Sequence, residues 1–208
     1  MADIVLDAQV APSTPAANTG VAWPDTNAKA WLQKDDAGRV SGDIADAIIA
    51  QIAAHSVDTY YKGIKLPSIS MQAGMTIEWE FSVTKGAAGT AAPIYTVRIG
   101  AAGTVADTAR LTLTGPAQTA AADSAIIQVR VTVRSVGAAG VLRGFARVDH
   151  NLAATGFANT PAGFSLTEAT AAGFDNSALG GQFIGLSVNP GASGAWVVEQ
   201  CVQRIFIG

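Results

Sequence analysis

The stretch Thr76-Ile77-Glu78-Trp79-Glu80-Phe81-Ser82-Val83-Thr84 alternates strictly between polar and apolar side chains. Successive side chains of a β-strand point to opposite faces of its sheet. The pattern therefore predicts a strand with one face in an apolar core and the other face in water. This nine-residue stretch gives the clearest indication of the fold class.

The same alternation returns further along the chain, between residues 127 and 134. Shorter strands fit residues 64–70, 94–99, 109–114, 141–148, 182–188 and 195–207. Glycine-rich turns separate these runs, and Gly-Ala-Ala-Gly occurs at 86–89, 100–103 and 137–140. We therefore expect an all-β protein whose residues 58–208 form an antiparallel, jelly-roll-like β-sandwich.

Residues 1–27 differ in composition from the rest of the chain. Ile4, Val5 and Leu6 form a short apolar patch, and a stretch rich in proline, alanine, serine and threonine follows them. Such a composition cannot build its own core, and proline prevents regular strand pairing. We interpret residues 1–27 as an extended attachment arm that docks on a partner; the alternative is a frayed terminus.

Residues 28–57 are expected to connect the arm to the sandwich. Within them, 41–54 is a possible short helix, because Ser41 can cap it and Ile44, Ile48 and Ile52 recur every four residues. The competing interpretation is a strand, since isoleucine is β-branched.

The last predicted strand carries apolar and polar groups on both of its faces. Trp196 and Phe206 share one face with Arg204, while Cys201 shares the other with Glu199. A strand with one face in the core and the other against a neighbouring subunit would show this pattern; a central strand buried within the monomer would show it too. Together with a charged fraction of only 14%, this favours a homo-oligomer.

No arrangement of reactive side chains predicts an enzyme. The chain has two histidines, His55 and His150, and Asp149-His150 lacks the glycine-flanked serine of a hydrolase. Glu78 and Glu80 share one face of a strand, but that face is otherwise typical of a solvated surface. We predict no catalytic residue, no cofactor and no metal site, since one cysteine and two distant histidines cannot bind zinc.

The overall charge and hydropathy exclude several partner classes. The formal net charge is -3 and no basic block is present, so we expect no nucleic-acid binding. No apolar segment is long enough to span a bilayer, and the first residues do not form a signal peptide. We therefore expect that the protein does not associate with a membrane and that it assembles in the cytoplasm.

A few aromatic residues are candidates for contacts with partners. Trp23 precedes Pro24 and could anchor the arm in a partner's pocket. Tyr60 and Tyr61 could form a platform on which sugar rings stack. The alternative for all three is packing against the sandwich. With Ile4, Val5, Leu6, Trp196, Arg204 and Phe206, they complete the predicted partner-binding set.

Several short stretches of the chain form a distinctive series, namely 84–93 (TKGAAGTAAP), 96–100 (TVRIG), 103–104 (GT), 107–111 (DTARL), 118–123 (QTAAAD) and 131–134 (VTVR). These stretches give residues 58–136 a resemblance to a module of tailed-bacteriophage virion proteins. It implies an antiparallel sandwich that forms a homotrimer, located in the virion as a small fibre, spike or decoration on other head, neck or tail proteins. The resemblance supplies no catalytic residues. The alternative is a receptor-binding module of a tail fibre, which would recognise a glycan of the host surface.

Overall fold

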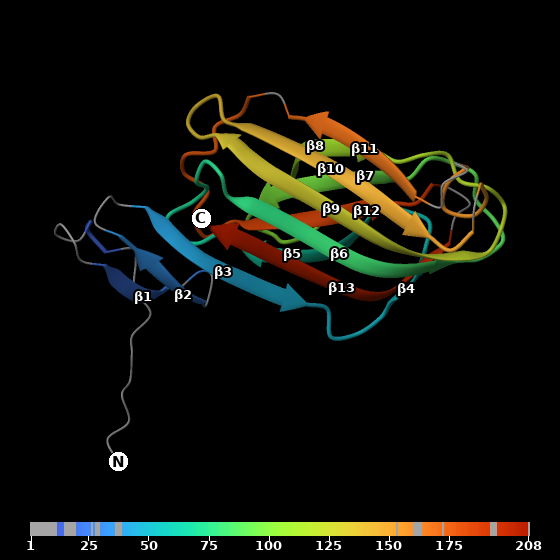
Figure 1. Cartoon of the computed structure of the whole chain (residues 1–208), viewed down its shortest axis with the longest axis horizontal. Coiled ribbons are helices and arrows are strands. Elements are labelled where there is room, and N and C mark those ends of the chain that lie inside the picture. Colours follow the sequence, from blue (N-terminus) through green and yellow to red (C-terminus); the bar gives the residue numbers. More distant parts are fainter. Residues whose placement is uncertain are drawn as a thin grey trace, which may run out of the picture.

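A computed structural model describes residues 12–14, 20–25, 27, 30–35, 39–152, 154–159, 164–171, 173–191 and 195–207. The described residues form thirteen β-strands and no helix. Every strand pairing between them is antiparallel, and the strands form two sheets packed face to face (Figure 1). The predicted all-β, jelly-roll-like sandwich is confirmed.

The larger sheet has nine strands, and Figure 1 looks onto its outer face. Its spatial order is β1 (Val21–Asp25), β2 (Ala30–Lys34), β3 (Val40–Ala47), β13 (Trp196–Ile207), β6 (Thr76–Lys85), β9 (Asp123–Ser135), β10 (Val141–His150) and β11 (Phe164–Thr170). The ninth strand, β4 (Ile52–His55), also pairs with β13.

The smaller sheet lies behind the larger one and has four strands. Their order is β5 (Thr59–Lys65), β12 (Phe183–Asn189), β7 (Ile94–Gly100) and β8 (Thr108–Thr114). The core lies between the sheets. The four apolar residues of the opening stretch, Ile77, Trp79, Phe81 and Val83, are each at most 1% exposed, as their alternation predicts.

The predicted helix over 41–54 is wrong. Residues 40–47 and 52–55 form β3 and β4, which lie end to end along β13. A spacing of four residues fits a strand as well as a helix, because four is twice the strand period. In the folded chain Ile44 is buried, whereas Ile49 is fully exposed in the short excursion between β3 and β4.

A β-bulge explains the mixed faces of the last strand. The register of β13 against β6 shifts between Val198 and Gln200. Trp196 and Val198 point into the core before the bulge, and Cys201, Gln203, Ile205 and Ile207 do so after it. Because the bulge moves the inward positions from even to odd numbers, β13 is a central strand of the monomer, and its pattern no longer argues for a subunit contact.

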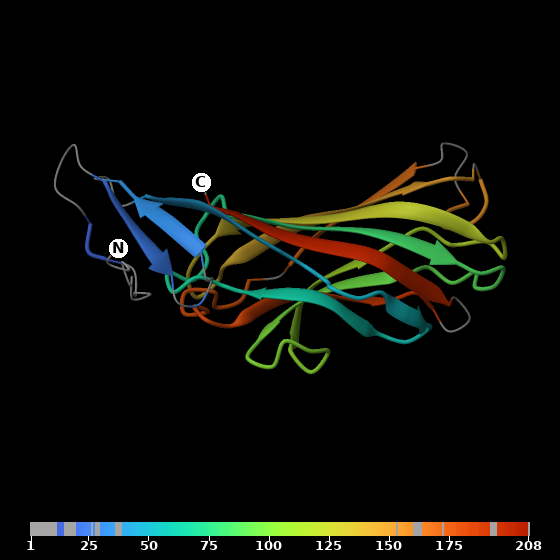
Figure 2. The ribbon, with the colours of Figure 1, turned by 90° about the horizontal axis from the view of Figure 1, so that it is seen from below.

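Among the described residues, regular β structure begins at Val21 rather than near residue 58. The hairpin of β1 and β2 extends the larger sheet past the edge of the smaller one (Figure 2). Its inner face is nevertheless closed, because Trp23 and Leu32 are buried and Asp25 Oδ2 accepts hydrogen bonds from the backbone and hydroxyl of Ser68. Most of the predicted attachment arm, including Ile4, Val5 and Leu6, lies outside the described residues.

Two further strands differ from the sequence prediction. The strand predicted at 64–70 lies earlier, at Thr59–Lys65, and Pro67 with no backbone N–H follows it. The alternation did not predict β11, because its apolar Leu166 is exposed while the polar Ser165 and Thr167 are partly buried.

Candidate functional site

Four loops meet at the end of the sandwich opposite the β1–β2 hairpin (Figures 1 and 2). They join β6 to β7, β8 to β9, β10 to β11 and β12 to β13, and we call this region the loop end. Its described residues are 86–93, 115–122, 151–152, 154–159, 190–191 and 195, and none of them is charged. Backbone hydrogen bonds, such as Thr119 N to Gly156 O at 2.9 Å, tie the loops to one another.

A buried lysine organises the loop end. The Lys85 ammonium donates to the carbonyls of Gly89, Thr119 and Gly156 at 3.2, 2.5 and 3.3 Å. These carbonyls belong to three different loops, so a single cation holds the three loops together. Lys85 is 4% exposed. Burial lowers the pKa of its ammonium, and the nearby carboxylate of Asp123 acts in the opposite direction.

Asp123 and His150 form a buried pair beside Lys85. Asp123 Oδ2 lies 3.1 Å from His150 Nδ1 and accepts a hydrogen bond from the backbone of Phe157. Both side chains are fully buried. Among the described residues His150 Nε2 has no hydrogen-bond partner, so within them the pair does not continue to a hydroxyl or thiol as a catalytic triad requires.

Gln118 forms a second hydrogen-bonded centre at the same end. Its amide nitrogen donates to the carbonyls of Ala91 and Pro190, and its amide oxygen accepts a hydrogen bond from Trp196 Nε1 at 3.0 Å. The Gln118 side chain therefore joins three loops to the core tryptophan. Sequence reasoning did not predict this role, because a glutamine within a run of alanines shows no pattern.

The catalytic alternatives weighed on the sequence do not assemble. Asp149 is paired with the exposed Arg147 rather than with His150, because neighbouring strand residues point to opposite faces. Glu78 is 5% exposed and is held by Arg130 Nε at 2.9 Å and Arg204 Nη1 at 3.6 Å. Burial raises the pKa of the Cys201 thiol to about 12, so the thiol is protonated at neutral pH.

The predicted partner-binding residues have different environments. Trp23, Tyr61 and Trp196 are buried. Arg204 and Phe206 lie on the outer face of the larger sheet, and Phe206 is 37% exposed. The two tyrosines do not form a stacking platform.

Tyr60 covers two glycines of the smaller sheet. A Cβ atom at Gly63 or Gly185 would lie 1.9 or 1.8 Å from the Tyr60 hydroxyl. These two positions must therefore be glycine for the ring to lie across β5 and β12.

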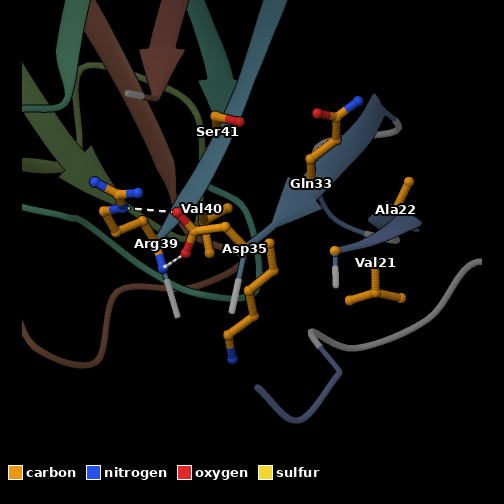
Figure 3. A pocket seen from close by; sticks show the side chains of 9 residues that line it. Val21, Ala22, Gln33, Asp35, Arg39, Val40 and Ser41 are labelled. Atoms are coloured by element: carbon orange, nitrogen blue, oxygen red, sulfur yellow. Dashed lines mark hydrogen bonds and ion pairs between the residues drawn. The ribbon is translucent and has the colours of Figure 1, made fainter. Parts of the chain in front are cut away.

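A groove is present beside β1, β2 and β3 of the larger sheet (Figure 3). It has a volume of about 520 Å³, and Asp35 and Arg39 form an ion pair at 2.6 Å on its wall. Lys34, at the rim, donates to the carbonyl of Pro12. The described part of the N-terminal segment therefore contacts this hairpin. The exposed tryptophan of the region is Trp31, at 55%, and not Trp23.

Within the described part of the chain, no group of three or more histidine, cysteine or acidic side chains could hold a metal ion. The same residues include no helix with the length and hydropathy of a membrane span.

No family model matches this chain, and no curated protein matches it significantly. Among solved structures, peanut lectin in complex with a nine-residue peptide (PVIWSSATG) is similar, with a TM-score of 0.37 and 10% sequence identity. The match covers 91% of this chain and 98% of the lectin chain. Similarity at this level carries no argument about ligands.

Proposed function

We propose that the protein is a non-enzymatic structural component of a tailed-phage virion. In this proposal it is a small homotrimeric fibre, spike or decoration that is attached to the particle through its N-terminal segment. The proposal starts from the resemblance of residues 58–136 to phage virion modules. The separation of the two ends of the fold supports it further.

One end of the molecule is suited to attachment. The β1–β2 hairpin extends beyond the sandwich there, and Lys34 of β2 donates a hydrogen bond to the carbonyl of Pro12. Trp31 pairs with Pro24 across the hairpin and leaves 55% of its surface exposed. Exposed tryptophans are frequent anchors of protein interfaces, so we place the contact with the particle at this end.

The opposite end is suited to display. The four loops of the loop end are tied together by Lys85, Gln118 and backbone hydrogen bonds. The side chains of Gln118 and Thr119 are used in these internal contacts, and the described residues of the four loops carry no charge. Such an end needs no partner to keep its shape while it projects from a particle.

A deletion of residues 1–19 tests the attachment. It removes most of the arm and keeps Trp23 and Asp25, which the core requires. We expect the truncated protein to fold and oligomerise as the full chain does, and to be absent from purified particles by mass spectrometry and immunogold electron microscopy. Arg134→Met, an exposed change on the sandwich, is the control and should incorporate normally. Truncated protein at wild-type occupancy would overturn the proposal.

A further inference from the structure

The outer face of the larger sheet contains a hollow over β9, β10 and β11. Two cross-strand rows line it: Gln128, Arg147 and Leu166, and next to them Arg130, Phe145 and Glu168. Its volume is about 550 Å³, which falls within the range of roughly 300–1,000 Å³ for small-molecule sites. The three strands that carry it are hydrogen-bonded to one another, with β10 paired on both sides and β11 at the edge of the sheet, so the backbone beneath the lining is fixed before any ligand arrives.

The charges around the hollow balance one another. Arg143 pairs with Glu168 at 2.6 Å, and Arg147 pairs with Asp149 at 3.1 Å. Arg130 binds Glu78. Each of these three guanidinium groups is thus paired with a carboxylate, and Glu78 is shared with Arg204 of β13. None of the three is an unpaired charge that would attract an anion. The hollow therefore favours an uncharged ligand.

The lining combines an apolar floor with both kinds of hydrogen-bonding group. Leu166 is 56% exposed, and Phe145 is partly exposed beside the Arg130 guanidinium, which lies 5.8 Å from the ring centroid. The Gln128 amide, with two donors and an acceptor, has no side-chain hydrogen bond to a described residue. A hydroxyl group both donates and accepts, so it can bridge a guanidinium and a carboxylate that already lie together.

We propose that this hollow binds an uncharged oligosaccharide. The C–H face of a sugar ring packs on Phe145 and Leu166, and the ring hydroxyls bind Gln128, Arg147 and Glu168. Recognition would use the outer face of the sheet, and it requires neither Tyr60 nor Tyr61. The inference goes beyond the structural role proposed above, because it stands whether or not the protein is attached to a particle.

Binding to an array of neutral and acidic oligosaccharides tests this inference. The neutral probes are hexamers of glucose, galactose and mannose, and the acidic probes are uronic-acid hexamers. We expect the full chain to bind at least one neutral probe at millimolar or lower concentration. Arg147→Met should weaken that binding by about tenfold, since it removes a charged hydrogen-bond donor. The matched control is Arg134→Met, which removes an exposed arginine of β9 outside the hollow, and it should change binding by less than about twofold.

Leu166→Asp provides a second variant, because it places a charge on the apolar floor while the side chain is exposed enough for the fold to tolerate it. Circular dichroism confirms that each variant is folded. Absence of binding to every neutral probe overturns the inference, as does binding to the acidic probes alone. Equal loss of binding in Arg147→Met and Arg134→Met also overturns it, because the ligand would then lie elsewhere. Loss of particle attachment in the deletion of residues 1–19 is measured separately, so the two proposals can fail independently.

Discussion

At the scale of single residues, the buried polar side chains determine how the loops are arranged. Lys85 and Asp123 are direct partners in the register between β6 and β9, yet each binds groups that lie far away along the chain. Lys85 reaches Gly156, 71 residues away. The alternating sequence pattern of β6 ends at Lys85, and nothing in that pattern indicates that the ammonium group is buried.

Replacing Lys85 tests this role. Lys85→Met keeps the apolar stem but leaves three carbonyls without their donor, so we expect the free energy of unfolding to fall by about 2–4 kcal/mol. Lys65→Met is the control, because Lys65 is exposed and only lies over the Phe183 ring at 5.4 Å; it should cost no more than about 1 kcal/mol. Urea unfolding at one fixed protein concentration measures both. Equal effects would contradict the role of Lys85.

His55 should make the stability depend on pH. Burial lowers the pKa of its imidazole from 6.5, and Nε2 lies 3.0 Å from the Tyr61 hydroxyl. Below pH 6.5 the unfolded chain then binds more protons at this residue than the folded chain. The contribution of His55 is therefore complete above pH 6.5 and decreases as the pH falls through the folded-state pKa.

His55→Gln removes this titration and keeps a hydrogen-bonding side chain beside Tyr61. We expect the variant to lose less stability than the wild type between pH 7.5 and pH 5, as measured by thermal unfolding. Parallel curves for the two proteins would show that His55 does not contribute.

At the scale of elements, local patterns predicted most strands of the sandwich and misjudged those whose burial depends on their neighbours. The alternation of polar and apolar side chains in β6 and β9 identifies the apolar face of each strand, which any β-sandwich would bury. The spacing of Ile44, Ile48 and Ile52 fits the period of a helix and the period of a strand equally well. The segment forms strands because it pairs with β13. The bulge in β13 lies opposite the excursion between β3 and β4, where Gln51 donates to Glu199.

The presence of strands in place of a helix over 41–54 leads to a prediction for Ile44 and Ile49. A helix over 41–54 would bury Ile44 and Ile49 on one face, whereas in the sandwich only Ile44 is buried. We expect Ile44→Ala to lower the free energy of unfolding by about 2–4 kcal/mol and Ile49→Ala to change it by less than about 0.5 kcal/mol. Similar decreases in the free energy of unfolding for the two variants, measured by denaturant unfolding, would instead support a helix over 41–54.

Packing of Tyr60 across β5 and β12 makes a second prediction. Gly185→Ala brings a methyl group onto the Tyr60 ring and should cost about 1–3 kcal/mol. The same change in a Tyr60→Ala background should cost much less, and the double-mutant cycle measures the coupling. Gly86→Ala is the control, because a Cβ atom there meets no heavy atom within 4 Å. Additive effects in the cycle would show that the two residues do not interact.

At the scale of the whole molecule, a hairpin marks one end of the sandwich and a set of cross-tied loops marks the other. Such an arrangement suits a protein that is attached at one end and displayed at the other. The low charge of the chain still favours burial of surface between copies, although β13 no longer supplies an argument for it.

The oligomeric state is directly measurable. We expect the full chain to be a homotrimer at micromolar concentration, with three times the 21.1 kDa of one chain. The resemblance to phage virion modules implies the trimer, and the small number of charges available to solvate the surface favours an oligomer. Light scattering coupled to size-exclusion chromatography gives the mass. A stable monomer at this concentration would remove the trimer from the proposed function.

The sequence by itself determined the all-β class, the inward faces of β6 and β9, and the lack of a recognisable catalytic motif. These properties depend on neighbouring residues, because strand alternation and motif spacing are local. Only the tertiary structure decided that residues 40–55 pair with β13, that a bulge reverses the faces of β13, and that His150 meets Asp123 rather than Asp149. It also brought together the hollow over β9, β10 and β11. Each of these features joins residues that are distant in the chain, and such pairings are set by the packing of the two sheets.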